Sequence, residues 1–323
     1  MPAFRVSVVS LGYASYEIER SLLRSIDAEL VLTSRDCLTE EEVIEAARDA
    51  DAILVREAPI RARVLQTLGR CRVIVRYGVG VDNIDLEEAR RKRIFVANVP
   101  GYGTEEVSDH AAALLLACVR RLLQRDAHLR RGVFESDIRE PVFRTTGKTL
   151  GLLGYGRIGR AFHRKWKGFL PARVLVYDPG VEPEVIRGQQ AEPVGLDELF
   201  SQSDYLSLHA PLTARTRHVV NAERLSLMKP AAILVNTARG ELIDEAALAE
   251  ALARERIAGA GLDVFEKEPL PADHPFLRLP NVVLSGHVGW YSRDAVHELQ
   301  RRAAEEVVRV LAGGIPQHWV NPW

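Results

Sequence analysis

Cysteine is scarce in this sequence, and its cysteines are not paired. The 323 residues include only Cys37, Cys71 and Cys118, and no CxxC pattern occurs. An odd number of scattered cysteines in a chain of this length is not typical of a disulfide framework. The scarcity argues against a small disulfide-rich extracellular domain and favours a reducing compartment. We therefore expect a cytoplasmic protein, and we predict no metal site.

The chain also lacks an excess of charge and a long apolar run. Its 43 basic and 44 acidic residues leave a net charge of −1, which gives no general attraction to nucleic acid or to a membrane surface. The longest apolar run, "HAAALLLACV" at 110–119, is far shorter than the ~20 residues that cross a bilayer. The first residues do not resemble a signal peptide. We expect neither nucleic acid nor membrane as a partner.

Apolar residues are abundant, and they occur in short runs that alternate with helical patterns. Hydrophobic residues make up 47% of the chain, and length divided by ~150 suggests about two domains. Short β-branched runs alternate with helical patterns, which predicts parallel sheets covered by helices on both faces. The first series of expected strands is 4–9, 52–55, 73–75 and 94–97, with helices at 40–50 and 60–68 between them. The second series is 148–154, 173–178, 205–208, 232–236, 259–264 and 281–285, with a helix at 244–255.

The region between the two series carries a long helical pattern. From Gly103 to Gly132 it predicts a helix of about 28 residues, or about 42 Å, with Thr104 as N-cap and Gly132 as stop. Such a helix is either a connector or dimer arm, or an ordinary core helix with a frayed tail; its length favours the arm. A second amphipathic helix, 293–314, is expected to return to the first series.

A glycine-rich turn follows one of the expected strands. The stretch "LGLLGYGRIGRAF" holds Gly154, Gly156 and Gly159 in a GxGxxG pattern, after an apolar strand and at the start of a helical pattern. The first glycine allows a tight turn, the second lets backbone approach a pyrophosphate, and the third lets helix and strand pack closely. The pyrophosphate would lie at the helix N-terminus, near the amides of Arg157 and Ile158. The motif predicts a dinucleotide site.

The strand after this turn ends in an acidic residue. Asp178 lies 19 positions after Gly159, at the end of "RVLVYD". A carboxylate there accepts hydrogen bonds from the ribose hydroxyls and repels a 2′-phosphate. The following "DPG" also fits an ordinary turn aspartate. Because strand, glycines, helix and carboxylate occur in the expected order, we predict NAD as the cofactor.

Three further stretches place reactive side chains just after apolar strands. "LVNTARGELID" carries Arg239, "GLDVFEKEPL" carries Asp263 and Glu268, and "LSGHVGW" carries His287. Ligands of doubly wound sheets bind outside the carboxyl ends of the strands, where all of these fall. Each residue alone has an ordinary alternative: a loop arginine, a surface glutamate, a packed core histidine.

Together these residue types suit one reaction. Hydride transfer to a 2-oxo acid needs a cation for the substrate carboxylate, and arginine binds carboxylates in a bidentate manner. It also needs an acid for the forming alkoxide, and histidine exchanges protons near neutral pH. A neighbouring carboxylate would orient that histidine and stabilise its charged form.

The sequence resembles the D-isomer-specific 2-hydroxyacid dehydrogenase family over essentially its whole length. "HVGWYS" (287–292) and the arginine-rich helix after it place the resemblance nearest the C-terminal binding protein-like and phosphoglycerate dehydrogenase-like branch. A glutamate at position 268, where formate dehydrogenases of this superfamily carry glutamine, argues against formate as the substrate. The matching stretches are "VRYGVGVDNID" (75–85), "GYGRIG" (154–159), "LMKPAAILVNTARGELID" (227–244), "AGLDVFEKEPL" (260–270) and "GHVGW" (286–290).

The resemblance implies roles for particular residues. Arg239 would bind the substrate carboxylate, His287 would be the general acid/base, and Glu268 would pair with it. The amides of Val79 and Gly80 would bind the substrate carboxylate. Further expected cofactor contacts are Thr104, His209, Ala210, Pro211, Thr216, Thr237, Ala238, Asp263 and Gly289.

The resemblance also implies the fold and assembly. We expect two flavodoxin/Rossmann-like, doubly wound parallel-sheet α/β domains, with NAD and substrate in the cleft between them. Residues 1–100 with 292–323 would form the substrate-binding domain, and 101–291 the NAD-binding domain. A homodimer is expected through the helix around 104–131. The expected activity is NAD-dependent interconversion of a 2-oxo acid and its D-2-hydroxy acid. The alternative is an NAD(H)-gated binding protein without catalysis, like the C-terminal binding protein corepressors.

The substrate side chain is left open by the sequence. Arg56, after the strand "AILV", takes the position of a phosphate-facing arginine in phosphoglycerate dehydrogenases and would read a second anionic group. Trp290 would instead favour an apolar or sulfur-containing side chain, and Arg76 is a further candidate substrate contact. The ordinary alternatives are a surface salt bridge for Arg56 and domain packing for Trp290.

Overall fold

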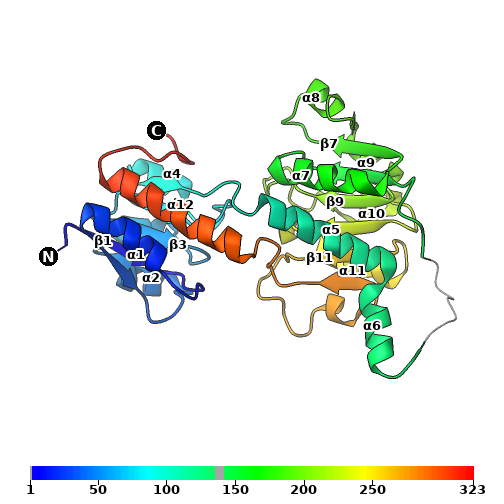
Figure 1. The fold of residues 1–323 in the computed structure, drawn as a ribbon, viewed down its shortest axis with the longest axis horizontal. Coiled ribbons are helices and arrows are strands. Elements are labelled where there is room, and N and C mark those ends of the chain that lie inside the picture. The colour runs from blue at the N-terminus through cyan, green and yellow to red at the C-terminus, as the bar shows by residue number, and fades with distance from the viewer. Residues whose placement is uncertain (1, 135–141) are drawn as a thin grey trace. The chain divides into compact units, whose positions relative to one another are not determined.

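The computed structural model describes residues 2–134 and 142–323, which form two compact units (Figure 1). Unit 1 comprises the residues up to Tyr102 together with Ser292–Trp323, and unit 2 comprises Gly103–Tyr291. Over the described residues each unit is built on one parallel sheet, five-stranded in unit 1 and seven-stranded in unit 2. The predicted fold class, two parallel-sheet α/β domains, is confirmed.

The sheet of unit 1 has the strand order β2-β1-β3-β4-β5, and every pair of neighbours is parallel. Helices α2, α3 and α4 share a core with Ile53 and Val55. Because side chains alternate along a strand, Ala52 and Leu54 point to the other face, where α1 and α12 pack against each other. The strands are β1 (Phe4–Val8), β2 (Ala28–Leu32), β3 (Ala52–Val55), β4 (Val73–Arg76) and β5 (Phe95–Ala97). The helices are α1 (Glu17–Leu23), α2 (Glu40–Ala47), α3 (Ala62–Thr67), α4 (Leu86–Arg91) and α12 (Arg293–Leu311), with a 3₁₀ turn at Arg24–Ile26.

The last residues of the chain cover the edge strand β5. Val320 donates its amide to the Val96 carbonyl at 2.9 Å, and Trp319 forms an antiparallel bridge with Ala97. The Asn321 side chain accepts from the Val96 amide at 2.8 Å and donates to the Ile94 carbonyl at 2.9 Å. These bonds satisfy backbone groups that an open sheet edge would leave unpaired.

The sheet of unit 2 has the order β12-β11-β10-β9-β6-β7-β8, again parallel throughout. The strands are β6 (Thr149–Leu153), β7 (Arg173–Tyr177), β8 (Glu192–Pro193), β9 (Tyr205–Leu208), β10 (Ile233–Asn236), β11 (Gly259–Leu262) and β12 (Val282–Leu284). The helices are α5 (Thr104–Arg120), α6 (Leu122–Arg130), α7 (Arg157–Trp166), α8 (Pro183–Arg187), α9 (Leu196–Gln202), α10 (Ala222–Leu227) and α11 (Glu245–Ala253). Three 3₁₀ turns lie at Lys167–Phe169, Gly240–Leu242 and Pro275–Arg278.

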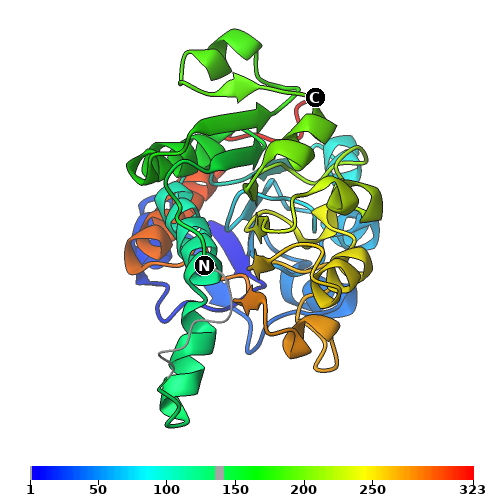
Figure 2. The same ribbon diagram turned by 90° about the vertical axis from the view of Figure 1, so that its right-hand side faces the viewer.

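Two apolar cores hold the layers of unit 2 together. One contains Leu115 of α5 with Phe162 and Trp166 of α7, and the other contains Phe200 of α9 and Leu248 of α11. Figure 2 shows α5 and α7 on one side of the sheet and the yellow-green helices on the other. Helices therefore cover both faces of the sheet, and the carboxyl ends of its strands lead into the loops between the two layers.

The prediction of one continuous helix from 104 to about 131 is wrong. Helix α5 ends at Arg120, and α6 begins at Leu122, because Arg121 takes a left-handed conformation with φ 49°. Thr104 is the first helical residue and Gly103 is the N-cap. The reason is packing: α5 buries a stripe of apolar side chains, whereas α6 buries none, so no core holds the chain on the axis of α5.

Most expected strands occur with their boundaries shifted by one or two residues. The strands expected at 52–55 and 205–208 match β3 and β9, and the helix expected at 293–314 ends at Leu311. Two strands were not expected. The edge strand β2 is only half-buried, and β8 contains two residues, one of them a proline, so neither produces a clear apolar run.

One buried histidine makes the stability of unit 2 depend on pH. His163 on α7 is 2% exposed, its Nδ1 lies 2.7 Å from the Tyr155 hydroxyl, and its Nε2 has no hydrogen-bond partner within the described part of the chain. Burial lowers the pKa of His163 from 6.5 to about 4. The folded protein therefore keeps this ring neutral at pH values where the unfolded chain protonates it.

We predict that the free energy of unfolding falls as pH drops from about 6.5 to about 4. The folded pKa of His163 is the lower one, so the unfolded state binds more protons across this window; the loss approaches ~3 kcal/mol at its acid end. His163→Gln keeps a hydrogen-bonding side chain and removes the titration, so its unfolding free energy should vary less. Urea unfolding followed by circular dichroism at several pH values measures this, with exposed His297→Gln as control. Equal pH dependence in the parent and His163→Gln would contradict it.

Candidate active site

The parallel sheet of unit 2 brings the predicted site residues to one edge. Strands β6, β9, β10, β11 and β12 are immediate neighbours that all point the same way. The segments that follow them begin at Gly154, His209, Thr237, Asp263 and Ser285. These residues come from sequence positions far apart, and the strand direction places them along a single border.

Each glycine of the GxGxxG turn meets a different steric demand. Gly154 has φ +95°, and a Cβ on it would lie 2.6 Å from the amide nitrogen of Ala210. A Cβ on Gly159 would lie 2.4 Å from the Gly154 carbonyl oxygen, so α7 packs directly on the turn. At Gly156 a Cβ would meet nothing within 4 Å, so the backbone there borders open space. These properties suit a turn that accepts a pyrophosphate.

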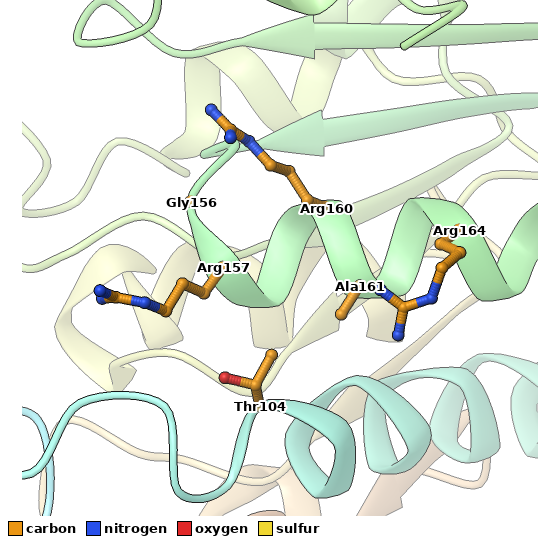
Figure 3. Close-up of a pocket in the computed structure, with 6 residues that line it drawn as sticks. All are labelled: Thr104, Gly156, Arg157, Arg160, Ala161 and Arg164. Carbon is orange, nitrogen blue, oxygen red and sulfur yellow. The ribbon is translucent and has the colours of Figure 1, made fainter.

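A basic groove lies beside this turn. A cavity of about 550 Å³ is lined by Gly156, Arg157, Ala161 and Arg164 of the turn and α7 and by Thr104 at the start of α5, with Arg160 at its border (Figure 3). Figure 3 shows Arg157 extending from the first turn of α7 and Arg160 on the side of α7 away from Thr104. A helix N-terminus and arginine side chains both favour an anion, so the residues present fit a dinucleotide phosphate.

Ion pairs join α5 to α7 below the groove. Arg164 donates to both oxygens of Glu105 at 2.7 and 2.9 Å, and Lys165 pairs with Glu105 at 2.9 Å and Asp109 at 2.6 Å. The hydrogen bonds from Lys165 and Arg164 lower the pKa of Glu105. These pairs keep the start of α5 beside the glycine turn, where Thr104 faces α7.

The carboxylate of Asp178 lies directly against the glycine turn. Its Oδ2 accepts from the Tyr155 amide at 2.7 Å, and its Oδ1 accepts from the Gly180 amide at 2.9 Å. Arg160 binds the same turn from outside, through Nε to the Tyr155 carbonyl at 3.0 Å. Each carboxylate oxygen keeps a further lone pair, and contact with ribose hydroxyls stays a prediction.

The other expected cofactor contacts border the ends of β9 and β10. Burial lowers the pKa of His209 to about 3, so this side chain is neutral near pH 7. The hydroxyl of Thr216 donates to the Pro211 carbonyl at 2.7 Å and thereby fixes the loop after Ala210. Thr237 is 9% exposed, and its hydroxyl has no hydrogen-bond partner among the described residues. Cofactor contact by these residues and by Ala238 stays a prediction.

His287 and Glu268 form a close pair. His287 Nδ1 lies 2.6 Å from Glu268 Oε2, and Glu268 Oε1 accepts from the Phe265 amide at 3.0 Å. Burial alone would raise the pKa of Glu268, but the bond to His287, the Phe265 amide and the nearby charge of Arg239 outweigh it and lower that pKa. The pairing leaves Nε2 as the ring nitrogen of His287 that can face a substrate.

Arg239 belongs to the same group. Asn236 holds its loop by donating to the Arg239 carbonyl at 2.8 Å and accepting from the Ala238 amide at 3.0 Å. A Cβ on the next residue, Gly240, would lie 1.8 Å from the Phe265 carbonyl carbon, so only glycine permits this approach. The loops that carry Arg239 and Glu268 are therefore packed backbone to backbone.

Sequence reasoning missed two residues near His287. His110 of α5 and Ser285 after β12 contact each other and Asp263, and Asp263 accepts from the Gly289 amide at 2.8 Å. His110 was seen only as the first residue of an apolar run, although a histidine on the buried side of a helix could have signalled a polar partner. Trp290 donates its indole N–H to the His287 carbonyl at 3.1 Å, so it packs within the same turn.

The predicted substrate contacts of unit 1 gather near Tyr13. Burial raises the pKa of Tyr13, and the charges of Arg56 and Arg76 partly oppose this. Arg76 donates to Glu57 at 3.1 Å and to the Tyr77 carbonyl at 2.8 Å. Arg56 covers Gly12, where a Cβ would lie 2.2 Å from its Nη1, and no hydrogen bond or ion pair of its guanidinium occurs among the described residues.

The backbone around Val79 is exposed and is held by a hydrogen bond from a neighbouring side chain. Val79 is 48% exposed, Asn98 donates to its carbonyl at 2.7 Å, and the preceding Gly78 has φ +146°. The amides of Val79 and Gly80 therefore lie in an irregular segment after β4, as a carboxylate-binding loop requires. Their contact with substrate stays a prediction.

Two features are absent from residues 2–134 and 142–323. No helix there is long and apolar enough to span a bilayer, and no group of three or more His, Cys, Asp or Glu side chains could hold a metal ion.

The chain was compared with known proteins. The family model described as D-isomer specific 2-hydroxyacid dehydrogenase, NAD binding domain, matches residues 112–289. A glyoxylate reductase of Korarchaeum cryptofilum is 40% identical over 287 residues, 88% of this chain and 86% of that protein. A D-3-phosphoglycerate dehydrogenase of Methanocaldococcus jannaschii is 41% identical over 286 residues, 88% of this chain and 54% of that protein.

A solved structure of a 2-hydroxy acid dehydrogenase also resembles this chain. The D-lactate dehydrogenase from Aquifex aeolicus, complexed with NAD and lactic acid, matches with a TM-score of 0.88 and 28% identity, covering 99% of both chains. The family model covers more than half of this chain, and the relatives align along most of it. The chain belongs to the D-isomer-specific 2-hydroxyacid dehydrogenase family, a family of NAD-binding oxidoreductases.

Proposed function

We propose that this enzyme interconverts a small 2-oxo acid and its D-2-hydroxy acid, with His287 as the group that gives and takes the proton. The observation that carries this proposal is the pairing of His287 with Glu268 at 2.6 Å, close to the charge of Arg239. When NAD is bound, it supplies the hydride chemistry. The protein's own side chains have to bind the substrate and move one proton.

Each residue of the group suits one task. The guanidinium of Arg239 binds the substrate carboxylate as a planar, bidentate donor. His287, with Nδ1 held by Glu268, presents Nε2 to the substrate oxygen and donates a proton during reduction. During oxidation the neutral ring accepts that proton. The lowered pKa of Glu268 keeps it ionised, so it orients the ring and stabilises its positive charge.

Domain roles follow from the same reasoning. We infer that unit 2, residues 103–291, binds NAD through the glycine turn and Asp178, and that unit 1 contributes substrate contacts. Limited proteolysis tests the assignment, because NAD should protect peptides of unit 2 more than peptides of unit 1.

The rival function is NAD-gated binding without catalysis. A turnover assay distinguishes it from the enzyme, because steady NADH oxidation with a 2-oxo acid rules it out.

We predict that His287→Ala lowers kcat for reduction by about 10²–10⁴-fold, the usual contribution of general acid catalysis. Glu268→Gln keeps the shape of its side chain but removes the charge that orients His287, so kcat should fall less, while NADH affinity changes little. In the parent, kcat/KM for reduction should fall as pH rises and kcat/KM for oxidation should rise. Stopped-flow NADH absorbance measures these rates.

His297→Ala, on an exposed face of α12, is the control for loss of a histidine. Near-parent turnover in His287→Ala would exclude His287 as the acid/base. A Glu268→Gln variant indistinguishable from the parent at every pH would remove Glu268 from the mechanism.

We propose that Asp178 makes NADH preferred over NADPH, because its carboxylate repels a 2′-phosphate. Asp178→Ala should narrow the ratio of kcat/KM for NADH to kcat/KM for NADPH by at least tenfold, an energy of ~1.4 kcal/mol. Asp197→Ala, in α9, removes an equal charge elsewhere and should leave the ratio unchanged. A parent enzyme that prefers NADPH would contradict the proposal.

We propose further that Arg56 reads a second anionic group on the substrate. Its guanidinium has no hydrogen bond or ion pair among the described residues, whereas Arg76 is engaged with Glu57 and Trp290 with the His287 carbonyl. Of these three candidate contacts, Arg56 is therefore the cation with capacity left for a ligand. This favours a phospho- or phosphono-acid over a substrate with an apolar side chain.

A substrate panel tests this point. Arg56→Ala should raise KM for 3-phosphohydroxypyruvate by about tenfold or more and leave KM for glyoxylate and pyruvate near the parent values, since loss of one charge-assisted hydrogen bond costs ~1.5–3 kcal/mol. Arg61→Ala, whose side chain donates to the Asp82 carbonyl at 3.0 Å, is the control. Equal changes for all three substrates would show that Arg56 is structural.

We propose that two copies associate through the surface around α5 and α6. Helix α6 buries no side chain within the chain, yet it carries Leu122, Leu123 and Leu129, which are 59%, 47% and 60% exposed. Exposed apolar side chains grouped on one short helix favour an interface. Sedimentation velocity should show a dimer for the parent and for Val185→Glu on α8, and a monomer for Leu129→Glu. A monomeric parent at micromolar concentration would contradict it.

A further inference from the structure

A hydrogen-bonded chain of three side chains lies beneath the turn that carries His287. His110 Nε2 on α5 is 2.7 Å from the Ser285 hydroxyl, and that hydroxyl donates to Asp263 Oδ1 at 2.6 Å. His110 Nε2 is itself 3.4 Å from Asp263 Oδ1. The three residues come from α5, from the end of β11 and from the end of β12, so the chain ties a helix to two strands.

The direction of these bonds follows from the number of protons available. Burial would raise the pKa of Asp263, but bonds from His110, Ser285 and two backbone amides outweigh it, so the pKa is lowered and the group is an acceptor only. The one hydroxyl proton of Ser285 therefore goes to Asp263. The Ser285 oxygen must then accept, so His110 carries its proton on Nε2 and donates.

Asp263 connects this hydrogen-bonded chain to the turn at 287–289. Its Oδ1 accepts from the Val288 amide at 3.0 Å and its Oδ2 from the Gly289 amide at 2.8 Å. Its own carbonyl accepts from the His287 amide at 2.6 Å. Three successive amides, from His287 to Gly289, are therefore held by one residue whose side chain is 2% exposed.

The turn needs such anchors. His287 has φ +56°, in the left-handed region that a residue with a Cβ adopts at a cost, and such a conformation persists only when its surroundings determine it. A Cβ on Gly289 would lie 2.9 Å from Asp263 Oδ2 and 3.2 Å from the His110 ring, so the turn rests directly on that imidazole. His110 thus supports the turn both by contact and through the hydrogen-bonded chain.

We propose that His110 is a positioning residue for proton transfer: through Ser285 and Asp263 it fixes the turn that directs His287 toward the substrate. The proposal rests on the proposed role of His287. Helix α5 is a suitable anchor because Ala111, Leu114 and Leu115, adjacent to His110 or one turn along, are buried in the core of unit 2. The rigid body of the helix is thereby connected to the one segment whose conformation is costly.

The main test replaces the His110 imidazole by another aromatic ring, so that no cavity is left. His110→Phe keeps an aromatic ring against Gly289 but cannot donate to Ser285. It should lower kcat for reduction by about 10–10²-fold, the size of effect expected when a reacting group is displaced by about an ångström. The solvent deuterium isotope effect on kcat should rise, because proton transfer becomes slower relative to other steps. A lower fraction of folded enzyme would reduce kcat without changing that isotope effect.

Two variants give the comparison. His110→Gln retains a donor that reaches Ser285, so it should recover most of the lost kcat. His297→Phe makes the same substitution on an exposed face of α12 and should behave as the parent. Should His110→Phe fail to fold, Ser285→Ala, which interrupts the same chain by removing one oxygen, is judged by the same measurements.

Hydrogen exchange provides a readout that does not need turnover. In His110→Phe, peptides containing residues 285–290 should exchange faster than in the parent, while peptides of α7 should be unchanged. Parent-like exchange in 285–290 overturns the proposal, and so does faster exchange with parent-like kcat and isotope effect. If instead the parent shows no turnover, or His287→Ala keeps it, the proposed function fails. If this inference alone fails, His287→Ala still loses about 10²–10⁴-fold in kcat.

Discussion

Every paired strand of unit 2 runs in the same direction, and the site depends on this constraint. Parallel strands place their carboxyl ends on one border, so the glycine turn, Arg239, Asp263 and the His287 turn become neighbours although they span more than a hundred residues. Helices cover both faces of the sheet, which leaves this border as the place where backbone groups remain available. The chemistry is therefore assembled from the ends of strands rather than from one local motif.

Close contacts between backbone segments fix the relative positions of the loops along this border. Gly159 lets α7 touch the Gly154 carbonyl, and Gly240 lets the Arg239 loop touch Phe265 in the Glu268 loop. At such contacts a single added carbon would separate the segments. The Glu268–His287 pair at 2.6 Å and the Asp263 carboxylate then connect adjacent loops by charge-assisted hydrogen bonds, which are short and directional.

Titratable side chains of unit 2 lie in two kinds of environment, one that keeps histidines neutral and one that keeps carboxylates charged. His163 and His209 lie where burial lowers the pKa of the ring, to about 4 and about 3, so they remain neutral and serve packing and the glycine turn. Asp263 is also buried, whereas the Glu268 side chain is 36% exposed; hydrogen-bond donors lower the pKa of both carboxyl groups and keep them charged. The border of the sheet thus holds two carboxylates, Asp263 and Glu268, that are kept charged by the donors they accept from.

The sequence by itself determined the fold class, the order of most elements and the family. Apolar runs such as 52–55 and 205–208 form buried strands. The glycine spacing at 154–159 and the stretch "NTARG" can be recognised locally, because the residues of each motif are close in sequence. Tertiary structure decided what depends on distant partners. It ends α5 at Arg120 because the core stops there, it covers edge strand β5 with the chain's last residues, and it gives His110 its role through Ser285 and Asp263. No window of sequence contains those contacts, because the residues that make them meet only after the sheets have formed.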